Sequence, residues 1–163
     1  MSIPVVAKFE VISDFKNSES SPIELPRRAT PGSAGYDFYV PKGLDITLQP
    51  GGVFVISAGI KCRIEEGWVL KLYPRSGLGF KYQVGIANTV GVIDSDYYNN
   101  PDNEGEICIK LVNRGNKEVV IPAGKAYCQG VFVPYGITED DSPVNPERVG
   151  GFGSSDNQKG ATT

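Results

Sequence analysis

The sequence predicts an all-β fold with little helix and a mobile C-terminal arm. Short Val- and Ile-rich runs recur along the 163 residues, and 20 glycines and 12 prolines punctuate them. No stretch keeps a helical period of apolar residues. Many short strands joined by tight turns are typical of sandwiches, barrels and jelly rolls.

The expected strands follow one another at regular spacing. Imperfect alternation over 3–12 predicts an opening strand, and the polar segment 13–28, with two prolines, predicts a loop. Further strands are expected at 36–40, 45–48, 52–57, 59–64, 68–73, 83–87, 91–94, 106–113, 118–121 and 126–133. The only helical expectation is a single turn at 76–80, which Gly77 and Gly79 disfavour.

Length and composition favour one compact domain, residues 1–135, followed by a flexible arm, residues 136–163, that is rich in Pro, Gly, Asp and Ser. The formal charge of -3 and the pI near 5.0 argue against a general nucleic-acid binder. No apolar run approaches the roughly 18 residues that span a bilayer. The N-terminus has no basic and then apolar leader, so we expect no membrane association and a cytoplasmic location.

The reactive residue types restrict the chemistry. The chain has no His, and its three cysteines, Cys62, Cys108 and Cys128, are odd in number and far apart. They are therefore expected as small core residues, in neither a zinc site nor a disulfide framework. Without His, acid–base catalysis near neutral pH must use another group, and a hydrolase would rely on Asp or Glu.

The segment Gly91–Tyr98, GVIDSDYY, carries two carboxylates, Asp94 and Asp96, on either side of Ser95. On an extended strand both carboxylates would point to one face, whereas at a turn they would diverge. Taken alone, the segment is more typical of an Asp-rich turn that closes a hairpin than of a catalytic site.

Three further segments each have a functional and an ordinary interpretation. Tyr73–Phe80 ends a strand in Pro-Arg-Ser-Gly, whose N–H groups, hydroxyl and guanidinium suit a phosphate nest, although Ser-Gly is also a common turn. Asp37, in Ser33–Val40, is on its own best interpreted as a solvated residue opposite a core face. Gln129 lies in an apolar strand, where a buried amide needs partners and can be a satisfied core group.

The last segment, Glu147–Asp156, combines Arg148 with glycines, serines and Phe152. Such a loop can wrap a triphosphate with its backbone amides while Arg148 pairs with a terminal phosphate. The alternative is a low-complexity tail with an incidental aromatic residue.

Taken together and in order, the five segments resemble the five motifs of the dUTPase family. The matching stretches are AGYD at 34–37, PRSG at 74–77, GVIDSDY at 91–97, GKAYCQ at 124–129 and RVGGFGSS at 148–155. The resemblance implies a jelly-roll-like β barrel that assembles as a C3 homotrimer, in which all three chains build each active site. It also implies Mg²⁺-dependent hydrolysis of dUTP to dUMP and pyrophosphate, which lowers dUTP and supplies dUMP for dTMP synthesis.

By this resemblance, Asp94 is the catalytic carboxylate that orients and deprotonates a water for attack on the α-phosphorus. Asp37 helps to hold the hydrated Mg²⁺. The hairpin of the third motif forms the uracil pocket, and Tyr97 lies against the deoxyribose, leaving no room for a 2′-hydroxyl. The other residues implied to contact substrate are Arg75, Ser76, Gly77, Asn88, Gly91, Val92, Gln129, Arg148, Phe152, Gly153, Ser154 and Ser155.

In the fifth motif, the resemblance assigns Arg148 to the γ-phosphate, Phe152 to a cap over the uracil, and 154–155 to closure over the phosphates. Three residues separate Arg148 from Phe152 where the family commonly has four. Ala126 stands where a basic residue is frequent. The stretch 98–104 is inserted before the next Gly-Glu strand, and we expect it to be a surface loop with exposed Tyr and Asn side chains.

Two other functions remain open from the sequence. A dCTP deaminase shares the fold, but it needs a Glu at the base, whereas Asp94 and Tyr97 follow the dUTPase arrangement. A nucleotide-binding regulatory protein would keep the fold and bind another protein, with 98–104 as a candidate contact.

Overall fold

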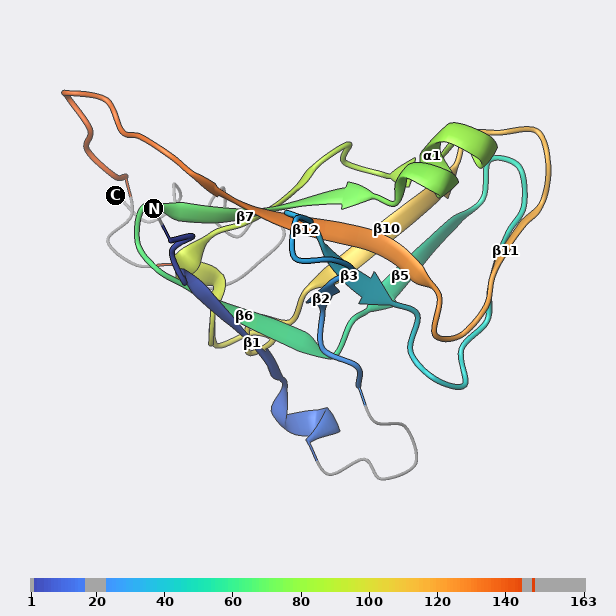
Figure 1. Ribbon diagram of the computed structural model, residues 1–163, viewed down its shortest axis with the longest axis horizontal. Coiled ribbons are helices and arrows are strands. Elements are labelled where there is room, and N and C mark those ends of the chain that lie inside the picture. The colour runs from blue at the N-terminus through green and yellow to red at the C-terminus, as the bar shows by residue number, and fades with distance from the viewer. Residues whose placement is uncertain (1, 17–22, 145–147, 149–163) are drawn as a thin grey trace, which may run out of the picture.

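The computed structural model describes residues 2–16, 23–144 and 148, and short antiparallel strands dominate them (Figure 1). The strands are β1 Ala7–Val11, β2 Arg27–Arg28, β3 Tyr36–Tyr39, β4 Ile46–Leu48, β5 Val53–Ser57, β6 Ile60–Ile64, β7 Trp68–Pro74, β8 Val84–Ile86, β9 Gly91–Ile93, β10 Cys108–Asn113, β11 Val119–Ile121 and β12 Ala126–Pro134. The helical elements are α1 Ser76–Tyr82 and the 3-10 turns η1 Ser13–Phe15 and η2 Ser95–Tyr97. The prediction of an all-β, jelly-roll-like fold is confirmed.

Three local expectations need correction. The opening strand begins at Ala7, not at residue 3, and the expected loop contains the two-residue strand β2, which pairs with β3. The helical turn continues to Tyr82, because Gln83 adopts a left-handed conformation (φ 56°) and its N–H closes the helix on the carbonyls of Gly79 and Leu78.

The strands form four antiparallel sheets. The largest has the order β2-β3-β12-β7-β9, and the others are β5-β10-β8, β1-β6 and β11-β4. In Figure 1, β12 and β7 run side by side across the molecule, and β12 lies at the centre of its sheet. This sheet matters for function because β3, β7, β9 and β12 carry or adjoin the first four motifs.

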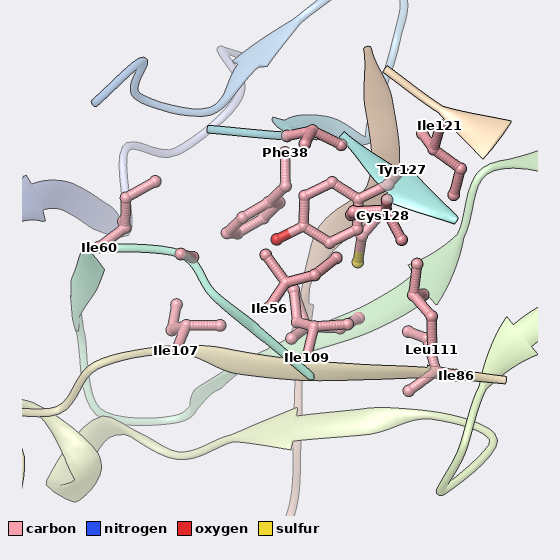
Figure 2. Packing of buried hydrophobic residues seen from close by; sticks show 14 of the residues in the cluster. Phe38, Ile56, Ile60, Ile86, Ile107, Ile109, Leu111, Ile121, Tyr127 and Cys128 are labelled. Carbon is pink, nitrogen blue, oxygen red and sulfur yellow. The ribbon is translucent and has the colours of Figure 1, made fainter. Parts of the chain in front are cut away.

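The core follows from alternation along the strands. In β10, Ile109 and Leu111 point inward while Lys110 is exposed. Figure 2 shows inward side chains of several strands packed around Tyr127 and Cys128 of β12. The core assignment is confirmed for Cys62 and Cys128, whereas Cys108 is only half-buried.

After β12, residues 136–144 are exposed and lie outside any strand or helix. The proposed division at residue 135 and the mobility of the arm stay predictions. Within the described ranges, no helix is long and apolar enough to cross a bilayer.

Candidate active site

A cavity of about 610 Å³ opens between the turn that joins β8 to β9 and strands β5 and β10. Its volume is typical of a small-ligand pocket. The lining residues are Val55, Leu72, Ile86, Ala87, Asn88, Val90, Gly91, Val92, Ile93, Tyr97, Cys108, Ile109, Lys110 and Arg148. Asn88, Gly91, Val92 and Tyr97 were predicted from the sequence, and the structure brings all four to this one cavity.

The turn that joins β8 to β9 is tight. Thr89 has a left-handed backbone (φ 69°), and its N–H donates to the carbonyl of Ile86 at 3.0 Å. Gly91 is needed for close packing, because an added Cβ would lie 3.0 Å from the Cβ of Leu72. This segment therefore brings its main chain, together with the side chains of Val90 and Val92, to the cavity wall.

Tyr97 forms a buried wall of the cavity, with 6% of its surface exposed. Its hydroxyl donates to the carbonyl oxygen of Glu106 at 2.8 Å and accepts from Asn103 Nδ2 at 2.8 Å. Burial is the main cause that raises the pKa of Tyr97, and the hydrogen bond from Asn103 opposes it. The phenol thus stays neutral and fixed at neutral pH.

The two carboxylates of the third motif converge at the mouth of the cavity. Arg148 Nη1 donates to Asp94 Oδ2 and to Asp96 Oδ1, each at 3.0 Å, and its guanidinium lies 5.3 Å from the centre of the Tyr97 ring. Burial tends to lower the pKa of Arg148, but the hydrogen bonds from it to Asp96 and Asp94 outweigh burial and raise it. We name Asp94, Asp96 and Arg148 the mouth cluster.

The mouth cluster departs from expectation in two ways. Asp94 and Asp96 belong to a turn, yet they do not diverge, because both accept hydrogen bonds from one nitrogen. Arg148, expected at a γ-phosphate, lies in this structure beside the carboxylates of its own chain. The sequence signal for Asp96 was its spacing of two from Asp94.

A second group of site residues lies at one end of the large sheet. Arg75 Nη1 contacts Asp37 Oδ1 at 2.7 Å, and the Asp37 side chain is only 8% exposed. Gln129 pairs with Asp37 across β12 and β3, and its Nε2 donates to the carbonyl of Pro74 at 3.3 Å. We name Asp37, Arg75 and Gln129 the strand-end cluster.

The first and second motifs explain this geometry. An added Cβ at Gly35 would lie 2.6 Å from Gln129 Oε1, so the glycine of the first motif lets the amide lie against the chain. Arg75 is the extended residue that precedes α1, and the exposed Ser76 and Gly77 begin the helix. Asp37 is therefore a buried ion-pair partner and not the solvated residue that the pattern alone favoured.

The two clusters lie far apart along one strand. Ile93 pairs with Leu70, so Asp94 lies beside Val69. Arg75 comes six residues after Val69, a separation of about 20 Å along an extended strand.

The residues at hand fit a magnesium ion held mostly by water and phosphate. No three His, Cys, Asp or Glu side chains gather as a metal cage anywhere in the described ranges. Mg²⁺ keeps several waters and uses one or two carboxylates together with substrate phosphates. A single carboxylate such as Asp37 suits that mode.

Some expectations are not tested by this geometry, and some residues were missed. Phe152, Gly153, Ser154 and Ser155 lie outside the described residues. The sequence did not point to Lys110 or Cys108 as cavity residues; they share an outward face of β10, a period-2 signal that the strand prediction already contained.

The fold and the site define a small all-β protein with a nucleoside-sized pocket and a carboxylate pair at its mouth. Comparison with known proteins makes this specific. The model of the dUTPase family matches residues 21–156. The chain belongs to the dUTPase family.

Related proteins of known sequence or structure support the same family assignment. A deoxyuridine 5'-triphosphate nucleotidohydrolase of Lactococcus lactis is 41% identical over 148 residues, 90% of this chain and 95% of that protein. The crystal structure of a dUTPase from Streptococcus mutans aligns with a TM-score of 0.68 and 37% identity, over 80% of this chain and 98% of that one. A mutant dUTPase from phage phi11 of S. aureus shares the fold at 20% identity and a TM-score of 0.64, over 86% of this chain and 98% of that one. The structure of that mutant is described as revealing the coordination of a structural Mg(II) ion.

Proposed function

We propose that the chain hydrolyses dUTP to dUMP and pyrophosphate. The observation that carries the proposal is the nucleoside-sized cavity, which has the carboxylate of Asp94 at its mouth and a fixed tyrosine as its wall. The relatives named as dUTP nucleotidohydrolases support the same substrate. Such a reaction would lower dUTP and supply dUMP for dTMP synthesis.

In the proposed reaction, the main chain between β8 and β9, with Asn88, Gly91 and Val92, holds the uracil. The ring of Tyr97 packs against the deoxyribose. Asp94 accepts a proton from a water whose oxygen forms a bond to the α-phosphorus, and the bond from that phosphorus to its bridging oxygen breaks to release pyrophosphate. A positioned general base typically contributes about 10²–10⁴-fold.

The strand-end cluster supplies the phosphate contacts. Arg75 and the amide of Gln129 offer donors, and Ser76 and Gly77 offer the N–H groups of a helix start, which have no partner within the helix. When bound, Mg²⁺ would neutralise triphosphate charge, and Asp37 would hold one of its waters. Arg148 would exchange its carboxylate partners for the γ-phosphate, and Phe152 to Ser155 would close over the nucleotide.

The separation of about 20 Å between Asp94 and Arg75 supports sites that are shared between chains. A base at the α-phosphorus and donors to the same triphosphate cannot act on one nucleotide across that distance. A closed symmetric ring would bring the mouth cluster of one chain to the strand-end cluster of the next, and the resemblance to the dUTPase family makes a C3 homotrimer the ring that we propose.

Mixed oligomers test the shared site. Asp94→Asn and Arg75→Met chains should each be nearly inactive alone, whereas oligomers assembled from both should regain activity at roughly a quarter of their sites. A mixture of Asp94→Asn and Asp94→Ala chains is the matched control and should stay inactive. Absence of recovery in the first mixture would mean that each site lies within one chain.

The activity itself is tested by pyrophosphate release from dUTP, with dTTP, dCTP and UTP as controls and with and without Mg²⁺. We expect turnover selective for dUTP, and a fall of about 10²–10⁴-fold in kcat for Asp94→Asn. Ammonia release from dCTP would instead identify the deaminase. Binding of dUTP without pyrophosphate release would favour the regulatory protein.

The regulatory alternative now needs a sharper test. The expected exposure of the 98–104 side chains is wrong for Asn100, which is 4% exposed, and Tyr98 is half-buried. Deleting the loop would remove structural contacts, so alanine at the exposed Pro101 and Asp102 is the better variant for a pull-down. Contact with a partner through this loop and a cytoplasmic location stay predictions.

A further inference from the structure

The inserted loop 98–104 is folded and contacts Tyr97, which lines the cavity. Asn100 Nδ2 donates to the carbonyl of Tyr97 at 3.0 Å and to Asn103 Oδ1 at 2.8 Å, and Asn100 Oδ1 accepts from the N–H groups of Asp102 and Asn103. Every hydrogen-bonding position of this buried amide is used. Asn100 thereby fixes the course of the loop directly after Tyr97.

Asn103 extends this network to the phenol. Its Oδ1 accepts from Asn100 Nδ2 and from the N–H of Gly105 at 3.1 Å, while its Nδ2 donates to the hydroxyl of Tyr97 at 2.8 Å and to the carbonyl of Glu106 at 3.4 Å. The amide oxygen of Asn103 therefore stabilises the loop, and its amide nitrogen binds the tyrosine hydroxyl. The two functions of one side chain can be separated by substitution.

The loop is held firmly enough to act as a support. Lys61, which is 5% exposed, donates to Glu104 Oε1 and to Asn99 Oδ1, each at 2.5 Å. At Gly105, with φ of 82°, an added Cβ would lie 2.5 Å from the carbonyl oxygen of Tyr97. The loop backbone thus lies in contact with the backbone of the tyrosine that it supports.

We propose that Asn103 is a positioning residue that sets the sugar specificity of the cavity by holding the Tyr97 ring in place. This inference rests on the proposed function. A wall that excludes a 2′-hydroxyl works only while it cannot recede, since rejection of an added hydroxyl by shape alone is modest. The second hydrogen bond on the phenol, from Asn103, limits that movement.

The test compares kcat/KM for dUTP and for UTP. In Asn103→Ala, the ratio of the two values should fall by about 3- to 10-fold, the effect of one hydrogen bond. Asn103→Asp keeps the acceptor for Asn100 and Gly105 and loses the donor to Tyr97. The single proton of the Tyr97 hydroxyl can then serve the carbonyl of Glu106 or the new carboxylate but not both, so one of its two hydrogen bonds is lost and the ratio should fall similarly, while the Tm stays closer to the native value. Asp102→Ala truncates an exposed side chain of the same loop and should leave the ratio unchanged.

A second arm separates this role from general loosening. In the Tyr97→Phe background there is no hydroxyl to hold, so Asn103→Ala should cause no further change in the ratio. Equal losses for both nucleotides, or an unchanged ratio in both Asn103 variants, would overturn the inference. If the native chain releases no pyrophosphate from dUTP, the proposed function falls, and this inference falls with it.

Discussion

Two buried tyrosines differ in the partners of their hydroxyl groups, and this difference predicts opposite effects of the same substitution. Tyr127 is completely buried, and its hydroxyl oxygen has no hydrogen-bond partner among the residues that the structure describes. Figure 2 shows this ring among apolar side chains such as Phe38 and Ile56. Burial raises the pKa of Tyr127 well above its ordinary value, in keeping with an apolar setting.

The expected effect of Tyr127→Phe follows from two terms. Burying an unsatisfied hydroxyl costs about 1–3 kcal/mol in proteins. Removing the oxygen leaves a void smaller than a methyl group, which costs less than about 1 kcal/mol. Tyr127→Phe should therefore raise the free energy of unfolding by about 1–2 kcal/mol, or Tm by roughly 2–8 °C for a chain of this size.

Tyr97→Phe is the matched control, because the hydroxyl of Tyr97 has two partners. Its loss should lower the free energy of unfolding by about 1–2 kcal/mol. Urea titrations at one protein concentration, compared at equal m-values, would measure both variants. A destabilised Tyr127→Phe would show that this hydroxyl is hydrogen-bonded in solution, and the reasoning would be refuted.

Three further predictions follow from other contacts. Arg75→Met removes the cation beside the buried Asp37 and should lower the free energy of unfolding by about 1–2 kcal/mol, an effect that should disappear in an Asp37→Asn background. The hydrogen bond from Lys61 is the largest cause that lowers the pKa of Glu104 to about 2, so this carboxylate adds stability above a pH of about 4.5 that is lost as the pH falls through about 2. Urea midpoints of the native chain should fall more steeply over that range than those of Glu104→Gln, and parallel curves would contradict the assignment. Gly91→Ala narrows the cavity against β7 and should raise KM for dUTP; an unchanged KM would argue that the substrate lies elsewhere.

The strands could be predicted because the pattern that specifies each of them lies within a short stretch of sequence. Alternation and turn residues gave β3 to β12 with ends that differ by at most two residues, as at 106–113 against Cys108–Asn113. β2 was missed since two residues carry no period, and only pairing with β3 makes Arg27–Arg28 a strand. The start of β1 was wrong because alternation continues through residues that find no partner strand.

The site was less accessible to sequence reasoning. The motifs identified Asp37 and Arg75 separately, but their ion pair joins residues 38 positions apart and depends on the register of β3, β12 and β7. The polar residues of 98–104 predict a surface loop. Asn100 and Asn103 are instead ordered by each other and by Tyr97, a network that polarity alone does not predict.

The register of β7 and β9 is the feature that supports the proposed shared site. Because the two strands are antiparallel, each step from Gly91 toward Asp94 moves the chain one residue further from Arg75. Slipping the register by one residue would turn the outward side chains of β9 into the core, and a slip of two would shorten the separation by only about 7 Å. No accessible pairing of these strands therefore brings Asp94 to the phosphate donors of its own chain. On the proposed function, a second copy would supply them, and in a closed ring every chain would both give and receive one half of a site.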